Sequence, residues 1–119
     1  MEFNAAVPIW MQVAARIKTD MVTGNLPPGA KLPGGRELAL QYTINPNTAA
    51  RVYQELEKEG LVEMRRGLGT YVTECPERID RLRGAMADSA VQDYLQRMAS
   101  LGFSRAEAAE MISQEEKQC

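Results

Sequence analysis

The sequence contains no histidine. This absence excludes Ser-His-Asp and Cys-His catalysis, zinc sites with histidine ligands and a pH switch built on imidazole. Cysteine is scarce as well, because Cys75 and Cys119 are the only two. Two cysteines make no disulfide framework and suit a reducing compartment. A redox-sensor role for them is disfavoured, since no cluster flanks either residue and one of them ends the chain.

Long apolar runs are also missing. None approaches the roughly 20 residues needed to cross a bilayer. The opening stretch, MEFNAAVPIW, lacks the basic region and apolar core of a signal peptide. We therefore expect a cytoplasmic chain with no membrane partner. No glycine-rich phosphate loop and no paired acid and base stand out, so we expect neither an enzyme nor a cofactor.

What is present is ordinary globular chemistry. The 119 residues are 45% apolar and 25% charged, which predicts one compact domain with a small appendage. The net charge of −2 hides a split between the two parts of the chain. Residues 1–73 carry eight Lys/Arg against seven Asp/Glu, whereas residues 74–119 carry six against nine. The local placement of charge matters more for binding than this total.

Three helices are predicted in the first half of the chain. An apolar residue every fourth position indicates a helix over 8–23. A short helix over 35–42 follows a stretch rich in proline and glycine. The next helix opens with Asn45 as N-cap and Pro46 at the first helical position, and Gly60 ends it. The last two helices, joined by a short turn, form a helix-turn-helix arrangement.

Two β-prone segments come next, over 61–64 and 70–73, and the RRGLG between them indicates a hairpin. Lys31 and Leu32 are candidates for a further, very short strand. The order of helix, short helix, longer helix and hairpin is typical of a winged helix-turn-helix. The expected fold is therefore mainly α with a small β-hairpin wing, an α+β class.

The chain then changes character at Pro76. One long helix is predicted over 77–101 and a last one over 105–117, which begins with a capping box formed by Ser104 and Glu107. We expect residues 1–75 to form the DNA-binding domain and residues 76–119 a helical dimerisation region. Its apolar positions are expected to pack within the chain and to pair two chains; they are Ile79, Leu82, Met86, Tyr94, Met98, Leu101 and Ile112.

Three segments carry a family resemblance: PGAKLPGGRELALQY, INPNTAARVYQELEKEGLVE and RRGLGTYV. Together they resemble the DNA-binding domain of GntR-family bacterial transcription regulators over residues 8–73. NPNT and the two-helix tail are similar to the YtrA-type subgroup, which implies a tail that dimerises and a gene near a membrane transporter operon. The chain departs from the family at Gly34, where serine is usual, at Pro46, where many members have arginine, and at Ala50, where some do.

The resemblance implies that Arg36 contacts DNA, and a guanidinium beside a helix N-terminus suits a phosphate. The alternative is a surface ion pair with Glu37 or Glu55. In the following helix, Asn47 and Arg51 are four residues apart and are predicted to read adenine and guanine edges.

Two neighbours of Asn47 are also assigned to DNA binding. Asn45 is expected to act mainly as a cap. For Thr48, a base contact and a role in starting the helix remain equal alternatives.

Arg65, Arg66, Gly67, Gly69 and Thr70 form the expected wing. Arginines at a hairpin tip can enter the minor groove or bind phosphates, and glycines let the backbone approach DNA closely. A solvated hairpin with incidental charge is the alternative.

The sequence thus predicts a homodimeric repressor that binds a pseudo-palindromic operator in double-stranded DNA. The alternative is a winged-helix protein-interaction module, favoured by the acidic balance and by Pro46 in the recognition helix. A small-molecule effector at the helical seam is a further hypothesis, motivated by Met86, Met98 and Met111.

Overall fold

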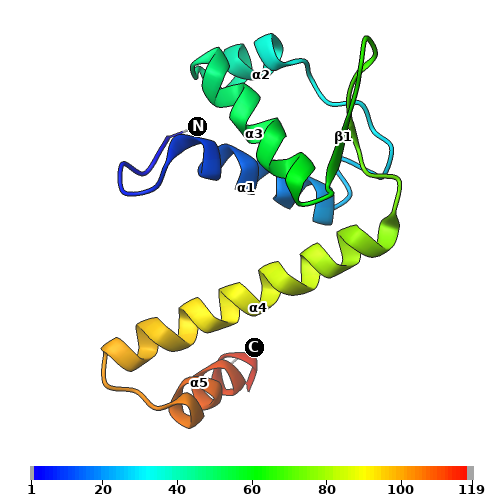
Figure 1. Ribbon diagram of the computed structural model, residues 1–119. Coiled ribbons are helices and arrows are strands. Elements are labelled where there is room, and N and C mark those ends of the chain that lie inside the picture. The colour runs from blue at the N-terminus through cyan, green and yellow to red at the C-terminus, as the bar shows by residue number, and fades with distance from the viewer. Residues whose placement is uncertain (1, 118–119) are drawn as a thin grey trace. The chain divides into compact units, whose positions relative to one another are not determined.

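The computed structural model describes residues 2–117, which form five helices and one hairpin (Figure 1). Contacts divide the chain into two compact units, Met1–Leu82 and Arg83–Cys119. The first unit contains helices α1 (Ile9–Val22), α2 (Gly35–Tyr42) and α3 (Pro46–Lys58), followed by strands β1 (Val62–Arg65) and β2 (Gly69–Val72). Helix α4 (Pro76–Ser100) begins in the first unit, and α5 (Arg105–Lys117) lies in the second. The predicted mainly helical α+β class with a hairpin wing is confirmed.

Helix α3 begins as its sequence indicates. The Asn45 side chain accepts a hydrogen bond from the Asn47 backbone N–H at 2.7 Å, and Pro46 occupies the first turn. The cap satisfies one of the amides that a helix start leaves unpaired. The helix ends before Gly60, whose φ of +74° lies in the left-handed region that glycine tolerates best. These two signals fix α3 between defined ends, which sets where its first turns lie.

The wing is an antiparallel pair whose register matches Val62 with Val72 and Arg65 with Gly69. It is one residue longer toward the tip, and one shorter at the base, than the sequence predicts. The expected short strand is present as a bridge between Lys31 and Tyr71, with Leu32 N–H donating to the Thr70 carbonyl at 2.8 Å. This third segment pairs with β2 and anchors the hairpin to the helical core.

A single apolar core lies among the three helices and the base of the hairpin. Its fully buried side chains include Val13, Met21, Leu38, Val52, Leu56 and Val72. Helix α3 packs against both α1 and α2. No buried side-chain N or O atom in the described part of the chain lacks a hydrogen-bond partner. The core therefore holds α3 firmly while leaving its opposite side in solvent.

Tyr53 connects α3 to the loop before α2, because its buried hydroxyl donates to the Pro33 carbonyl oxygen. Burial raises the pKa of this phenol well above its usual range, and Tyr42 and Glu37 add to the effect. The folded state therefore keeps the phenol neutral at a pH where the unfolded chain ionises it.

The contribution of Tyr53 to stability is expected to be constant below about pH 10 and to fall as the pH rises above it, since only the unfolded chain then gains from ionisation. The Tyr53→Phe variant should lose about 1 kcal/mol at pH 8 through the missing hydrogen bond. It should also show a shallower loss between pH 9 and 11, measured by thermal unfolding. The pKa of Tyr42 is raised as well, so some slope remains. Identical pH profiles for the two proteins would contradict this role of Tyr53.

Helix α4 starts on the first unit, where Arg78 Nη1 donates to the Gly60 carbonyl at 2.9 Å. Ile79 is 8% exposed and belongs to the core, and Leu82 packs against it. For this reason the contact boundary falls after Leu82, whereas the sequence places the division after residue 75. In the second unit, the predicted capping box starts α5. Glu107 N–H donates to Ser104 Oγ at 3.1 Å, and Ser104 N–H donates to Glu107 Oε1 at 3.0 Å. These hydrogen bonds lower the pKa of Glu107.

Candidate nucleic-acid interface

The side of α3 that turns away from the core presents polar and small side chains to solvent. Four exposed residues lie there: Pro46, Asn47, Ala50 and Gln54. Ala50 is four residues after Pro46 and three after Asn47, and Gln54 is four after Ala50, which are the spacings of neighbours on a helix surface. We call these four residues the open face of α3. Among the described contacts, none of their side chains has a hydrogen bond or an ion pair. The open face is thus available to a ligand from the first turn of the helix to the start of the third.

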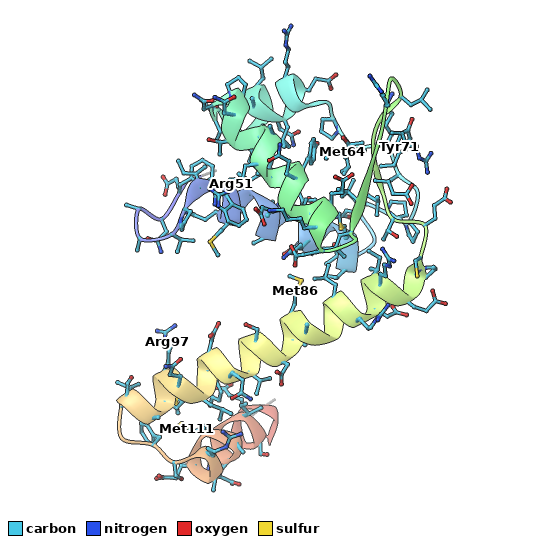
Figure 2. The ribbon with its side chains drawn as sticks, in the orientation of Figure 1. Arg51, Met64, Tyr71, Met86, Arg97 and Met111 are labelled. Carbon is cyan, nitrogen blue, oxygen red and sulfur yellow. The ribbon has the colours of Figure 1, made fainter. Side chains whose placement is uncertain are left out.

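Contacts on both flanks of α3 fix the direction of this face. Glu57 is seven residues after Ala50, which places the two on the same side of a helix with 3.6 residues per turn. Its Oε2 accepts from the Met64 N–H of β1 at 3.3 Å, so this side looks toward the wing. On the opposite flank, the Arg51 guanidinium lies over the Trp10 ring of α1, 4.7 Å from its centroid (Figure 2). The open face therefore lies between these flanks, on the wing side of Arg51.

This geometry separates the two residues that the sequence expects to read bases. Asn47 is exposed on the open face, as predicted. Arg51 is exposed too, but its charged group stacks on Trp10 instead of pointing along the open face. The spacing of Asn47 and Arg51 did not reveal this difference, because it does not show that the Arg51 guanidinium turns toward a ring on α1. Thr48 is half-buried, and Asn45 is engaged as the cap.

Arg36 stands in the first turn of α2. It is exposed, and it forms no ion pair within the described structure, so the predicted alternative pairs with Glu37 and Glu55 do not form there. Gly34 occupies the N-cap position and offers no side-chain hydrogen bond. The first amides of α2 therefore lack a side-chain acceptor beside a free guanidinium, which is a favourable arrangement for a phosphate oxygen.

The wing divides its two arginines between different tasks. Arg65 is held within the chain: its Nη2 lies 3.2 Å from Glu63 and 3.7 Å from Glu74, and its guanidinium stacks on Tyr71 at 4.3 Å. Arg66 is exposed at the tip, with no acidic partner among residues 2–117. Of the two, only Arg66 is free to take a new anionic partner without losing an existing one.

The remaining wing residues, Gly67, Gly69 and Thr70, also differ in their structural roles. Gly67 and Gly69 have φ values of +76° and +119°, so they make the turn that other residues would strain. Thr70 is only 7% exposed, and its carbonyl accepts from Leu32. Thr70 is the second residue of β2, paired with Met64, and its side chain is buried and not on the solvent face of the wing. Thr70 shares its face of β2 with the buried Val72, two residues later.

Two further polar residues, Gln54 and Lys31, were not predicted from the sequence as part of this interface. Gln54 lies on the open face, seven residues after Asn47, a spacing that could have revealed it. Lys31 is exposed beside the wing, where its Cε lies 3.1 Å from the position that a Cβ on Gly69 would take. No acidic partner of Lys31 occurs among the contacts of the described chain. Arg36, Arg66 and Lys31 thus give three uncommitted cations around an uncharged open face.

The second unit has a different surface. Met86, Tyr94 and Met98 are half-buried, and the Tyr94 hydroxyl donates to the Ala108 carbonyl at 2.8 Å, joining α4 to α5. Leu101 and Ile112 remain 71% and 53% exposed. Other exposed apolar residues of the same unit are Val91 and Met111.

The apolar positions that the sequence assigns to the dimer interface do not all belong to one surface. Ile79 and Leu82 serve the core of the first unit, which is a correction to their expected place. Helices α4 and α5 instead border a hollow of about 360 Å³ lined by Tyr94, Met111, Ile112, Gln114 and Glu115. An apolar side chain left in water gives up the free energy that burial would gain, so this surface favours a covering partner.

Other functional chemistry finds little support. Within the described range, no three Cys, Asp or Glu residues gather closely enough to hold a metal ion. No helix there has the length and apolar character needed to cross a membrane. Cys75 is half-buried, and its thiol donates to Glu77 Oε2 at 3.2 Å; Cys119 lies outside the described residues.

A helix-turn-helix with a β-hairpin wing and free cations on α2 and on the hairpin defines a winged-helix DNA-binding protein. Comparison with known proteins identifies the family. Residues 11–72 match the pattern of "Bacterial regulatory proteins, gntR family". The chain therefore belongs to the GntR family, and it is a DNA-binding transcription regulator and not an enzyme.

Three relatives illustrate the likeness. The HTH-type transcriptional regulator YhcF of Bacillus subtilis is 39% identical over 93% of this chain and 92% of its own length. The HTH-type transcriptional repressor YtrA of the same organism is 44% identical over 60% of this chain and 55% of its own. A GntR family transcriptional regulator from Listeria monocytogenes has a solved structure that superposes with a TM-score of 0.86, at 33% identity, over 94% of this chain and 98% of its own. The first of these likenesses and the last include both helices of the tail.

Proposed function

We propose that this regulator is a repressor that binds a pseudo-palindromic operator as a homodimer. Residues 1–75 bind one half-site each, and residues 76–119 pair the two chains. The observation that carries the proposal is the set of three uncommitted cations, Arg36, Arg66 and Lys31, around the solvent-facing start of α3. Repression is steric in this scheme, because a bound dimer occupies DNA that polymerase needs. The relative YtrA is named a transcriptional repressor, which supports this sign of regulation.

Pairing of two chains follows from the apolar surface of α4 and α5. Leu101 and Ile112 are largely exposed in one chain, and a second copy would cover them. A two-fold dimer presents its two α3 helices to half-sites about one helical turn apart, or a multiple of that distance. This activity belongs in the cytoplasm, where the chromosome lies. Control of a transporter operon and an effector in the tail are further parts of the proposal.

Selection of bound sequences from random double-stranded DNA tests the proposal directly. We expect a consensus with two inverted half-sites, and a mobility shift by the purified protein on that consensus at modest salt. Binding with no preference over scrambled competitor would overturn the proposal. That result would favour the alternative, a winged-helix module that docks proteins.

The wing gives a second test. Arg66→Ala is expected to weaken binding to all DNA sequences alike, because a phosphate contact carries no sequence information. It should also flatten the plot of log affinity against log salt by about one unit for each protomer. Arg105→Ala removes the same charge from the tail and is the matched control, with no expected change. An unchanged salt slope for Arg66→Ala would remove the wing tip from the interface.

A further inference from the structure

The open face of α3 has a chemical composition that restricts the bases it can recognise. Asn47 and Gln54 contribute amides, and Pro46 and Ala50 contribute apolar groups. None of the four side chains is charged. A carboxamide pairs in two-point fashion with the N6 and N7 atoms of adenine, whereas an apolar group fits the C5-methyl of thymine. The two amide side chains of the open face therefore match adenine and the two apolar side chains match thymine, so the face as a whole suits A·T pairs.

Guanine recognition in the major groove requires a different group. Two-point contact with guanine O6 and N7 is made best by arginine or lysine. The one arginine in the first turns of α3 is Arg51, and its guanidinium stacks on Trp10 of α1, away from the open face. An arginine drawn away to the base edges would lose this stacking, which favours its present position.

The apolar part of the face continues behind Pro46. A hollow of about 600 Å³ lies between α2 and the start of α3. It is lined by Arg36, Ala39, Leu40, Thr43, Ile44 and Pro46, and Leu40 is 81% exposed. Because Arg36 and Pro46 line the same hollow, a duplex that contacted both Arg36 and Asn47 would pass across Pro46. Its methyl groups would then meet apolar surface and not a charged side chain.

We propose that the base pairs facing α3 in each half-site are A·T pairs, with Asn47 and Gln54 bonding adenine and with Ala50 and Pro46 contacting thymine methyl groups. This inference rests on the proposed operator binding and names the sequence class that the same site prefers. Arg36, Lys31 and Arg66 supply affinity through phosphates. Arg51 stays on Trp10 and contributes no base preference.

The thymine contact is tested by replacing single thymines of the selected operator with deoxyuridine, which removes only the methyl group. Loss of one buried methyl is expected to reduce affinity about fourfold at one or more positions facing α3. The same replacement in the flanks is the control and should change nothing. Neutral replacements at every half-site position would overturn the proposal.

A double-substitution cycle then assigns the contact to a residue. In Ala50→Ser, which adds a hydroxyl to the Cβ carbon and so puts a polar group against the thymine methyl, the deoxyuridine effect should shrink to within about twofold at the position that Ala50 reads. Ala50 is exposed, so the substitution leaves the core intact, and thermal unfolding checks this. An undiminished deoxyuridine effect in both Ala50→Ser and Pro46→Ser would remove the apolar pair from recognition.

Selection repeated with Arg51→Ala completes the design. The consensus should be the same as for the unaltered protein. Loss of an invariant guanine in that experiment would show that Arg51 leaves Trp10 to read it, and would overturn the proposal. These outcomes differ from failure of operator binding itself, in which no consensus emerges for any of the proteins.

Discussion

Asn47→Asp is expected to weaken operator binding by at least about a hundredfold while making the protein slightly more stable. Asn47 occupies the first turn of α3, where a negative charge interacts favourably with the positive end of the helix dipole, by about 0.3–1 kcal/mol. Against DNA the same carboxylate faces phosphates and base acceptors, and juxtaposed like charges cost several kcal/mol. Thermal unfolding and a mobility shift on the selected operator measure the two effects.

The opposite signs make this variant informative. A loss of DNA binding that accompanies a rise in melting temperature cannot come from misfolding. Gln92→Asp adds the same charge on an exposed position of α4 and is the matched control, with unchanged affinity expected. Full operator binding by Asn47→Asp would take Asn47, and with it the start of α3, out of the interface.

Ile112→Asp is expected to convert the proposed dimer into monomers at micromolar concentration. The side chain is about half exposed in one chain, so an aspartate there is solvated and α5 still forms. In a covered seam the carboxylate loses its water without gaining a partner, a penalty of several kcal/mol. We expect the dimer dissociation constant to rise at least about a hundredfold, and sedimentation velocity measures it. Operator affinity should fall as well, because the second half-site is no longer bound by a tethered partner.

Ser113→Asp is the control for this experiment. It places the same charge on the next residue of α5, which is exposed and polar already. It should remain dimeric. A persistent dimer in Ile112→Asp would place the contact between chains on another face of the tail.

Helix boundaries could be predicted from the sequence because the signals for them are local. Asn45 and Pro46 start α3, and Ser104 with Glu107 starts α5, each through hydrogen bonds that span only a few residues. The capping of one turn depends little on the rest of the chain. The same holds for the glycines that end the helices, since a left-handed residue is required at that point alone.

Side-chain partners were less predictable because they depend on segments distant in sequence. Arg51 stacks on Trp10, and the Thr70 carbonyl accepts a hydrogen bond from the Leu32 N–H. Ile79 belongs to an apolar stripe whose periodicity is correct, yet its partner is the core of the first unit. Periodicity indicates which side of a helix is apolar, but it does not say what covers that side. The exposure of Arg36, Asn47 and Arg66 could be predicted, because exposure at an element's end needs no such partner; their contacts with DNA stay a prediction.

The stacked pair on α1 and α3 has a practical consequence. Trp10 is the sole tryptophan of the chain. It lies half-buried beneath the Arg51 guanidinium, on the flank of α3 that adjoins the proposed operator contact. Its emission spectrum therefore originates from a single indole next to the recognition helix. The chain thus contains its own optical probe, which follows events at that helix in unlabelled material.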